Sequence, residues 1–206
     1  MSNTVETRHY AILESNLTRA AEDQPRRLEG YAAVFDSPSQ PFRDFTEIVK
    51  PGAFARSLSE AASGDRRIHA LWSHRDAEPL GSTASGKLVL REDAKGLWFS
   101  LDTSRFTAAQ ISAAEDGDLR MSFGFNIREQ SWTEGDEGTI REVVDVDLYE
   151  VSPVINPAYP DTSAALRSLT EFRSQSLAEA APDAKANMIR VDALKRHAEA
   201  RAMRLR

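Results

Sequence analysis

The stretch Leu119–Trp132, LRMSFGFNIREQSW, carries the clearest structural pattern in the chain. Apolar and polar residues alternate along it with a period of two, which is typical of a β-strand whose two faces differ. One face carries an apolar row, and the other carries small or polar residues, among them Ser122 and Gly124. We therefore expect a long strand that buries its apolar row in a core.

Flanking segments suggest more strands and a few helices. Strand composition and turn residues predict short strands at 10–13, 27–35, 45–49, 67–74, 87–91, 96–101 and 139–151. Helical composition predicts helices at 53–62 and at 104–115, the second with Ser104 as its cap. This order of elements favours a mainly β domain with peripheral helices, built as a small barrel or sandwich.

We expect three segments along the chain: a polar lead-in at 1–26, the β domain at 27–165, and a helix-prone tail at 166–206. The tail differs from the body in charge. The whole chain carries a net charge of −6, whereas residues 183–206 contain seven Lys or Arg and three Asp or Glu. A basic amphipathic helix on an acidic body is therefore predicted.

Composition excludes several classes of function. The absence of cysteine removes a thiol nucleophile, a thiolate zinc site and disulfides. Four histidines without an HExxH spacing argue against a metal site, and no glycine-rich phosphate loop occurs. The acidic balance argues against nucleic acid binding, and no apolar run resembles a membrane span or a secretory signal. We expect a soluble intracellular protein without a cofactor.

Three residues could carry chemistry, and each has a plainer alternative. His74 ends the predicted strand 67–74 in phase with its apolar row, so it is either a general base or a packed core histidine. Ser122 lies opposite the apolar row, and Gly124 would leave room beside it for a substrate backbone; the alternative is a solvent-facing serine. Glu150 continues the apolar row of 144, 146 and 148, so it either orients an imidazole or has emerged into solvent. Asp145 and Asp147, on the other face, are expected to be solvated.

Five segments, in order, resemble the prohead proteases of tailed phages, which are related to the herpesvirus assemblins. They are LEGYAAVF (28–35), FTEIVKPGAFARS (45–57), ALWSHRD (70–76) followed by Pro79-Leu80-Gly81, MSFGF (121–125) and LYEVSPVINPAY (148–159). The resemblance covers roughly residues 27–165. One departure is Arg75, which separates His74 from Asp76, where the family often has His-Asp directly.

The resemblance implies a serine endopeptidase with an assemblin-like β-barrel. His74 would match the catalytic histidine, Ser122 the nucleophile and Glu150 the third member of a triad. The segment 155–159 is our expectation for an oxyanion donor. Such a protease would act in the bacterial cytoplasm inside an immature capsid, cleaving scaffold segments and the major capsid protein. It would often cleave itself, here near 178–186, and its relation to assemblins implies a weak homodimer.

Two other functions remain open from the sequence. A capsid-associated scaffold or structural protein could keep the fold without the activity. A small hydrolase could use the same serine and histidine on esters rather than peptides.

Overall fold

The computed structural model describes residues 5–10, 16–17, 26–39, 44–135, 138–155 and 165–176. Contacts divide the chain into two units, 1–164 and 165–206. In the second unit, the described residues 165–176 form a helix. None of the described helices is long and apolar enough to cross a membrane.

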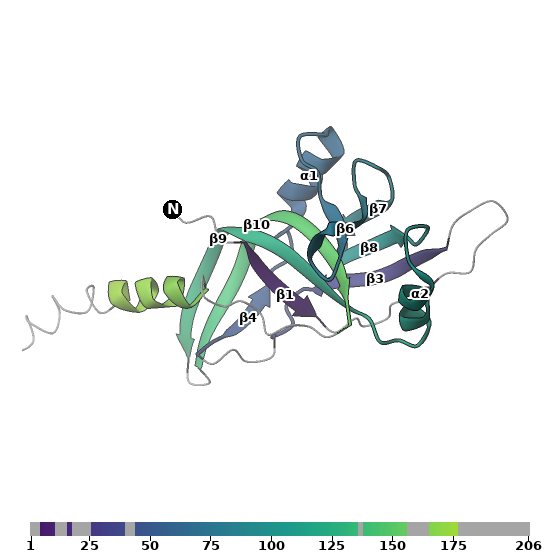
Figure 1. Ribbon diagram of the computed structural model, residues 1–206. Coiled ribbons are helices and arrows are strands. Elements are labelled where there is room, and N and C mark those ends of the chain that lie inside the picture. The colour runs from purple at the N-terminus through teal and green to yellow at the C-terminus, as the bar shows by residue number, and fades with distance from the viewer. Residues whose placement is uncertain are drawn as a thin grey trace, which may run out of the picture. The chain divides into compact units, whose positions relative to one another are not determined.

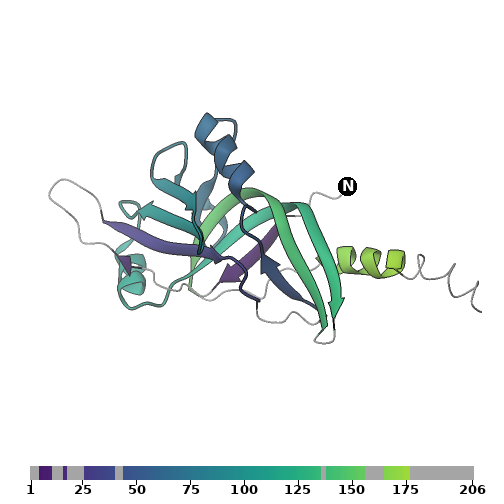
Figure 2. The ribbon, with the colours of Figure 1, turned by 180° about the vertical axis from the view of Figure 1, so that it is seen from behind.

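The first unit is mainly β, and a long hairpin of β9 (Arg120–Gly135) and β10 (Gly138–Val154) runs through it. These two strands curve together along their whole length (Figures 1 and 2). They belong to a sheet of order β1-β9-β10-β5-β6, in which β4 also pairs with β10 in parallel. Its other strands are β1 (Glu6–Tyr10), β4 (Thr46–Val49), β5 (His69–Trp72) and β6 (Arg75–Ser82).

A second sheet has the order β2-β3-β8-β7. Its strands are β2 (Asn16–Leu17), β3 (Arg27–Val34), β7 (Leu88–Glu92) and β8 (Gly96–Asp102). The helices of the first unit are α1 (Ala55–Ser63) and α2 (Ala108–Glu115). Thr107, not Ser104, caps α2. Its hydroxyl accepts a hydrogen bond from the Gln110 backbone amide as part of a capping box.

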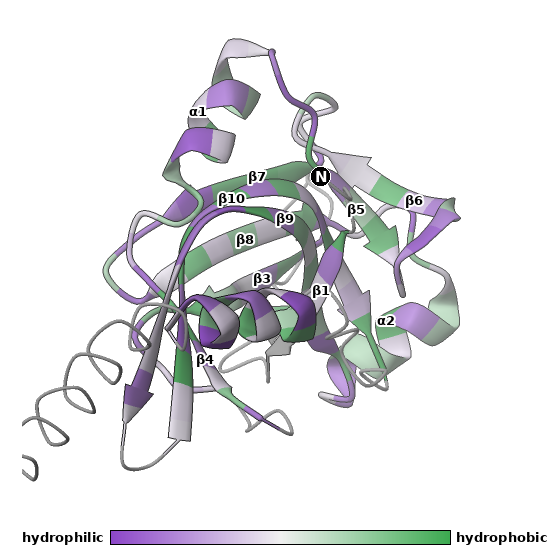
Figure 3. Ribbon diagram, turned by 90° about the vertical axis from the view of Figure 1, so that its left-hand side faces the viewer, coloured by the Kyte–Doolittle hydropathy of each residue, from purple (hydrophilic) through white to green (hydrophobic). Residues whose placement is uncertain are grey.

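Apolar side chains from both sheets enclose one core. Most of the apolar row of β9 is buried there, as predicted: Met121, Phe123 and Phe125 are fully buried and Ile127 is partly buried. The Phe123 ring meets the Phe54 ring edge to face, with 5.3 Å between the ring centroids. Figure 3 shows apolar residues recurring along the strands of both sheets. The mainly β expectation with peripheral helices is confirmed.

The N-terminal segment differs from the expected lead-in. A strand that was not predicted, β1, lies at Glu6–Tyr10, and residues 11–13 of the strand predicted at 10–13 lie outside the described residues. β1 pairs antiparallel with β9, with His9 in register with Ser122. Part of segment 1–26 is thus a strand of the sheet that carries Ser122.

A buried charge cluster explains how this short polar strand is held. Arg8 and Glu6 of β1 meet Glu47 of β4 and Arg141 of β10, and each of the four is at most 4% exposed. Arg8 Nε donates to Glu47 Oε1 at 2.7 Å, and Arg141 Nη1 donates to Glu6 Oε2 at 2.8 Å and to Glu47 Oε2 at 2.9 Å. Two positive and two negative charges therefore balance inside the protein. Alternation alone did not reveal this cluster, because the four residues come from three strands.

We expect Arg141→Met to destabilise the protein by about 3–5 kcal/mol, because it leaves two buried carboxylates with one arginine. Urea denaturation measures the change. The control is Arg26→Met, which removes an exposed ion pair with Glu115 and should cost about 1 kcal/mol or less. Equal costs for the two variants would contradict the balanced-cluster interpretation.

The cluster also makes stability depend on acid. Burial works to raise the pKa of Glu6, but the hydrogen bonds and charges of Arg141 and Arg8 outweigh it and hold that pKa below its ordinary value of 4.5. A carboxyl group whose pKa is lowered by folding stabilises the folded state at pH values above its unfolded pKa. This stabilisation is lost as the pH falls below 4.5 towards the pKa of the folded state. Glu6→Gln should therefore flatten the loss of stability below pH 4.5, measured by urea denaturation across pH 3–6 relative to the wild type. Parallel curves would contradict this.

Candidate active site

His74 lies in a tight turn rather than on a strand. β5 ends at Trp72, β6 begins at Arg75, and these two residues pair across the turn. The two residues between them, Ser73 and His74, have positive φ values of 50° and 62°. Such conformations suit two-residue hairpin turns but are unfavourable for residues with a Cβ. The prediction that His74 continues the apolar row of its strand is therefore wrong.

The turn is anchored to the strand that carries Glu150. The Ser73 amide donates to the Pro153 carbonyl of β10 at 3.1 Å. The Nδ1 atom of the His74 ring contacts Glu150 Oε1 on the same strand. The His74 side chain is 25% exposed, so the ring is partly accessible while its Nε2 atom is buried.

A β-bulge sets the direction of Glu150. Leu148 pairs with Phe125, whereas Glu150 pairs with Gly124, so Tyr149 is an extra residue on β10. One extra residue reverses the alternation of a strand. Glu150 therefore lies on the face of Ser122 and Gly124 rather than continuing the apolar row, and that prediction is wrong. Bulges often redirect a side chain beside an active site.

Gly124 provides the space for the Glu150 carboxyl group. A Cβ at position 124 would lie 2.6 Å from Glu150 Oε1 and 3.2 Å from its Cδ. Only glycine fits without moving the carboxylate. The space beside Ser122 that we assigned to a substrate backbone is thus occupied by Glu150.

Ser122 is fully buried, which rules out the solvent-facing alternative. Its Oγ donates to the Arg8 carbonyl of β1 at 3.0 Å. Directly across the hairpin it pairs with Ser152 of β10. Residues paired in this way have side chains on the same face, about 4.5–5.5 Å apart at Cβ.

Ser152 is a residue that sequence analysis missed. It is fully buried, and its hydroxyl contacts Glu150 Oε2, whereas His74 Nδ1 contacts Glu150 Oε1. The structure thus brings His74, Glu150 and Ser152 into a continuous chain of contacts, with Ser122 beside its end. The EVS motif at 150–152 could have signalled this pairing, but only with the bulge known.

The contact between the Glu150 carboxylate and His74 Nδ1 determines what the histidine can do chemically. A carboxylate that accepts from Nδ1–H fixes the imidazole tautomer and leaves Nε2 with a lone pair able to take a proton. Among the described residues, no group of three or more His, Asp or Glu is placed to hold a metal ion. A histidine held by a carboxylate in this way is suited to general acid–base catalysis.

A cavity of about 410 Å³ borders Glu150. Its walls combine apolar side chains with a few polar ones: His69, Leu71, Asp76, Pro79, Tyr149 and Glu150. Asp76, next but one to His74, is thus beside the site rather than part of the contact chain.

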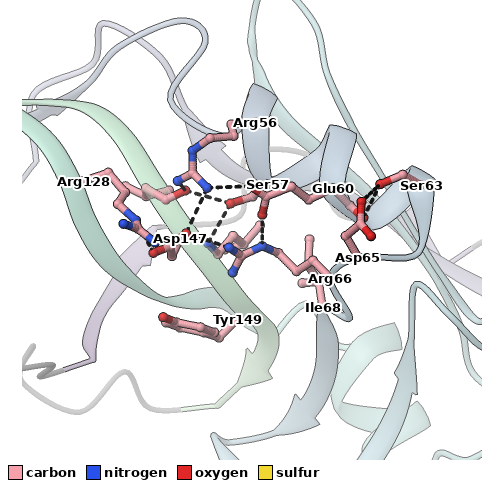
Figure 4. Close-up of polar contacts among 12 residues, drawn as sticks. Arg56, Ser57, Glu60, Ser63, Asp65, Arg66, Ile68, Arg128, Asp147 and Tyr149 are labelled. Atoms are coloured by element: carbon pink, nitrogen blue, oxygen red, sulfur yellow. Dashed lines mark hydrogen bonds and ion pairs between the residues drawn. The ribbon is translucent and has the colours of Figure 1, made fainter.

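An ion-pair cluster fixes α1 against the same stretch of β10 (Figure 4). Asp147 is 5% exposed and accepts from Arg56, Arg66 and Arg128, so the expectation that it is solvated is wrong. Burial works to raise the pKa of Asp147, but these arginines outweigh it and lower that pKa. Asp145, half-buried, also pairs with Arg56, at 2.9 Å.

The backbone of β10 is held by the same helix. The buried Ser57 hydroxyl of α1 donates to the Val146 carbonyl at 2.7 Å and accepts the Leu148 amide at 3.0 Å. These bonds lie immediately before the bulge. They fix the strand where the direction of Glu150 is decided.

The expected oxyanion segment 155–159 is described only at Ile155, which is 48% exposed. The expected cleavage region 178–186 lies outside the described residues.

A comparison with protein families identifies the chain. The family of Caudovirus prohead serine proteases matches residues 14–175, which is more than half of the sequence. The chain therefore belongs to this family of serine proteases of phage capsid maturation. Searches of curated proteins and of solved structures return no match.

The Glu150 contact predicts the tautomer of His74. In the wild type, ¹⁵N-resolved NMR of the histidine ring at a pH where the ring is neutral should show the proton on Nδ1. Gly124→Ala should shift the population towards Nε2–H, because the new methyl displaces the Glu150 carboxylate. Gly135→Ala on the same strand is the control, since its nearest neighbour would lie at 3.9 Å. An Nε2–H wild type, or no difference between the two glycine variants, would contradict this geometry.

Proposed function

We propose that this member of the prohead serine proteases is an active endopeptidase in which Ser122 is the nucleophile, His74 its general base and Glu150 the residue that orients His74. The observation that carries the proposal is the contact between His74 Nδ1 and Glu150 on the sheet face that also carries the buried Ser122. A serine, a histidine and a carboxylate with these roles recur on unrelated folds.

In this mechanism the Ser122 hydroxyl leaves the Arg8 carbonyl and attacks the scissile carbonyl carbon of the substrate. His74 Nε2 takes the hydroxyl proton and then delivers it to the leaving amine. Glu150 stabilises the imidazolium that forms between these two transfers. Water then attacks the acyl-enzyme with the same histidine as base, and Ser122 regains its proton.

Family membership supports association with capsid proteins in the procapsid. We propose that the substrates are scaffold segments and extensions of the major capsid protein. We further propose that the enzyme removes its own basic tail near 178–186. The cavity beside Glu150, with apolar walls at Leu71, Pro79 and Tyr149, is our candidate for a pocket that receives a substrate side chain.

Ser122→Ala and His74→Ala should each lower the rate of cleavage of the cognate major capsid protein by roughly 10³-fold or more. Gel and mass-spectrometric time courses with purified full-length enzyme measure this, and intact mass reports tail removal in the same samples. The matched control is Ser131→Ala, an exposed serine on the same strand, which should cleave like the wild type.

The outcomes separate the alternatives. A Ser122→Ala variant as fast as the wild type would exclude Ser122 as nucleophile. A folded wild type that cleaves neither the capsid protein nor itself would favour the non-enzymatic scaffold function.

A further inference from the structure

We propose that Ser152 is a positioning residue of this site: its hydroxyl holds the Glu150 carboxylate in the orientation that receives His74. This inference rests on the proposed function and extends the triad by a fourth residue. The two oxygens of Glu150 have different partners, because Oε1 contacts His74 Nδ1 and Oε2 contacts the Ser152 hydroxyl.

Burial makes both contacts necessary. Glu150 is only 8% exposed and Ser152 is fully buried, so little water is available to the carboxylate. A buried carboxylate without hydrogen-bond donors is strongly unfavourable. The Ser152 hydroxyl supplies a donor to Oε2, and His74 Nδ1 supplies one to Oε1.

The surroundings leave the carboxylate one orientation. Gly124 lies against it, with a virtual Cβ at 2.6 Å from Oε1. The bulge at Tyr149 directs the Glu150 side chain to the face of Ser122 and Gly124, and the Ser152 hydroxyl contacts its Oε2. With both oxygens engaged, rotation of the carboxyl group would break two contacts at once. Ser152 thereby maintains the His74 ring in the orientation and tautomer of a base.

Ser152 and Ser122 are cross-strand neighbours with different partners. The Ser152 hydroxyl faces a carboxylate, whereas the Ser122 hydroxyl donates to the Arg8 backbone carbonyl. The Ser152 hydroxyl contacts the carboxylate that orients His74. It is therefore placed to position that carboxylate rather than to attack a substrate. The two buried serines are therefore assigned separate roles.

Ser152→Ala should lower kcat about tenfold with little change in KM, because one hydrogen bond to a charged group is lost while the nucleophile and cavity remain. Ser152→Thr keeps the hydroxyl and should restore most of kcat. Ser152→Cys is close to serine in size but a weak donor, so it should lose kcat as Ser152→Ala does. In NMR, Ser152→Ala should move the His74 tautomer population away from Nδ1–H.

Ser100→Ala is the matched control. Ser100 is 3% exposed, lies on β8 of the other sheet, and also donates to a carboxylate, Glu29 Oε1, at 2.7 Å. It should lose comparable stability and keep kcat and the His74 tautomer. Denaturant unfolding of all variants measures whether Ser100→Ala and Ser152→Ala lose comparable stability.

A Ser152→Ala enzyme with wild-type kcat and an unchanged His74 tautomer would overturn the proposal. Loss of activity as complete as in Ser122→Ala would also overturn it, because a positioning residue leaves residual catalysis. Failure of the proposed function is distinguishable: the wild type would then be inactive on capsid protein, while the His74 tautomer in Ser152→Ala would still decide whether Ser152 positions the histidine.

Discussion

One extra residue in β10, Tyr149, determines the candidate site. Without this bulge, Glu150 would continue the row of Leu148 into the core, and a charged group there would have no partner. With it, the carboxylate reaches the face of Ser122 and meets His74 and Ser152. A local irregularity of one strand thus brings Glu150 to a histidine that lies 76 residues away in the sequence.

Much of the structure serves to keep β10 in place around the bulge. Ser57 of α1 binds the backbone just before it, and Arg56 and Arg66 hold Asp147. Beyond it, the Pro153 carbonyl anchors the turn that carries His74. At the far end of the strand, Arg141 joins the buried charge cluster. A site that must be accurate to a fraction of an ångström requires such support from rigid elements.

Period and composition predicted the fold class and most strands, because alternation along β9 and turn residues between segments are local signals. They placed β4, α1, β7, β8 and the long hairpin close to their observed bounds. They missed β6, since Arg75–Ser82 begins with polar, exposed residues, and they did not predict β1 at Glu6–Tyr10. Similarity of the five segments to a family selected His74, Ser122 and Glu150, which alternation alone did not separate from ordinary strand residues.

The direction of Glu150 could not be predicted, because a bulge is a property of pairing between two strands. The partner Ser152 depended on that same pairing.

The most direct test of the central claim, that Ser122 is activated by His74, is covalent labelling with a fluorophosphonate, which reacts with an activated serine far faster than with an ordinary one. Peptide mapping of the labelled wild type should place the phosphonyl group on Ser122, and His74→Ala should not be labelled. A label on Ser152, or equal labelling of wild type and His74→Ala, would contradict the account.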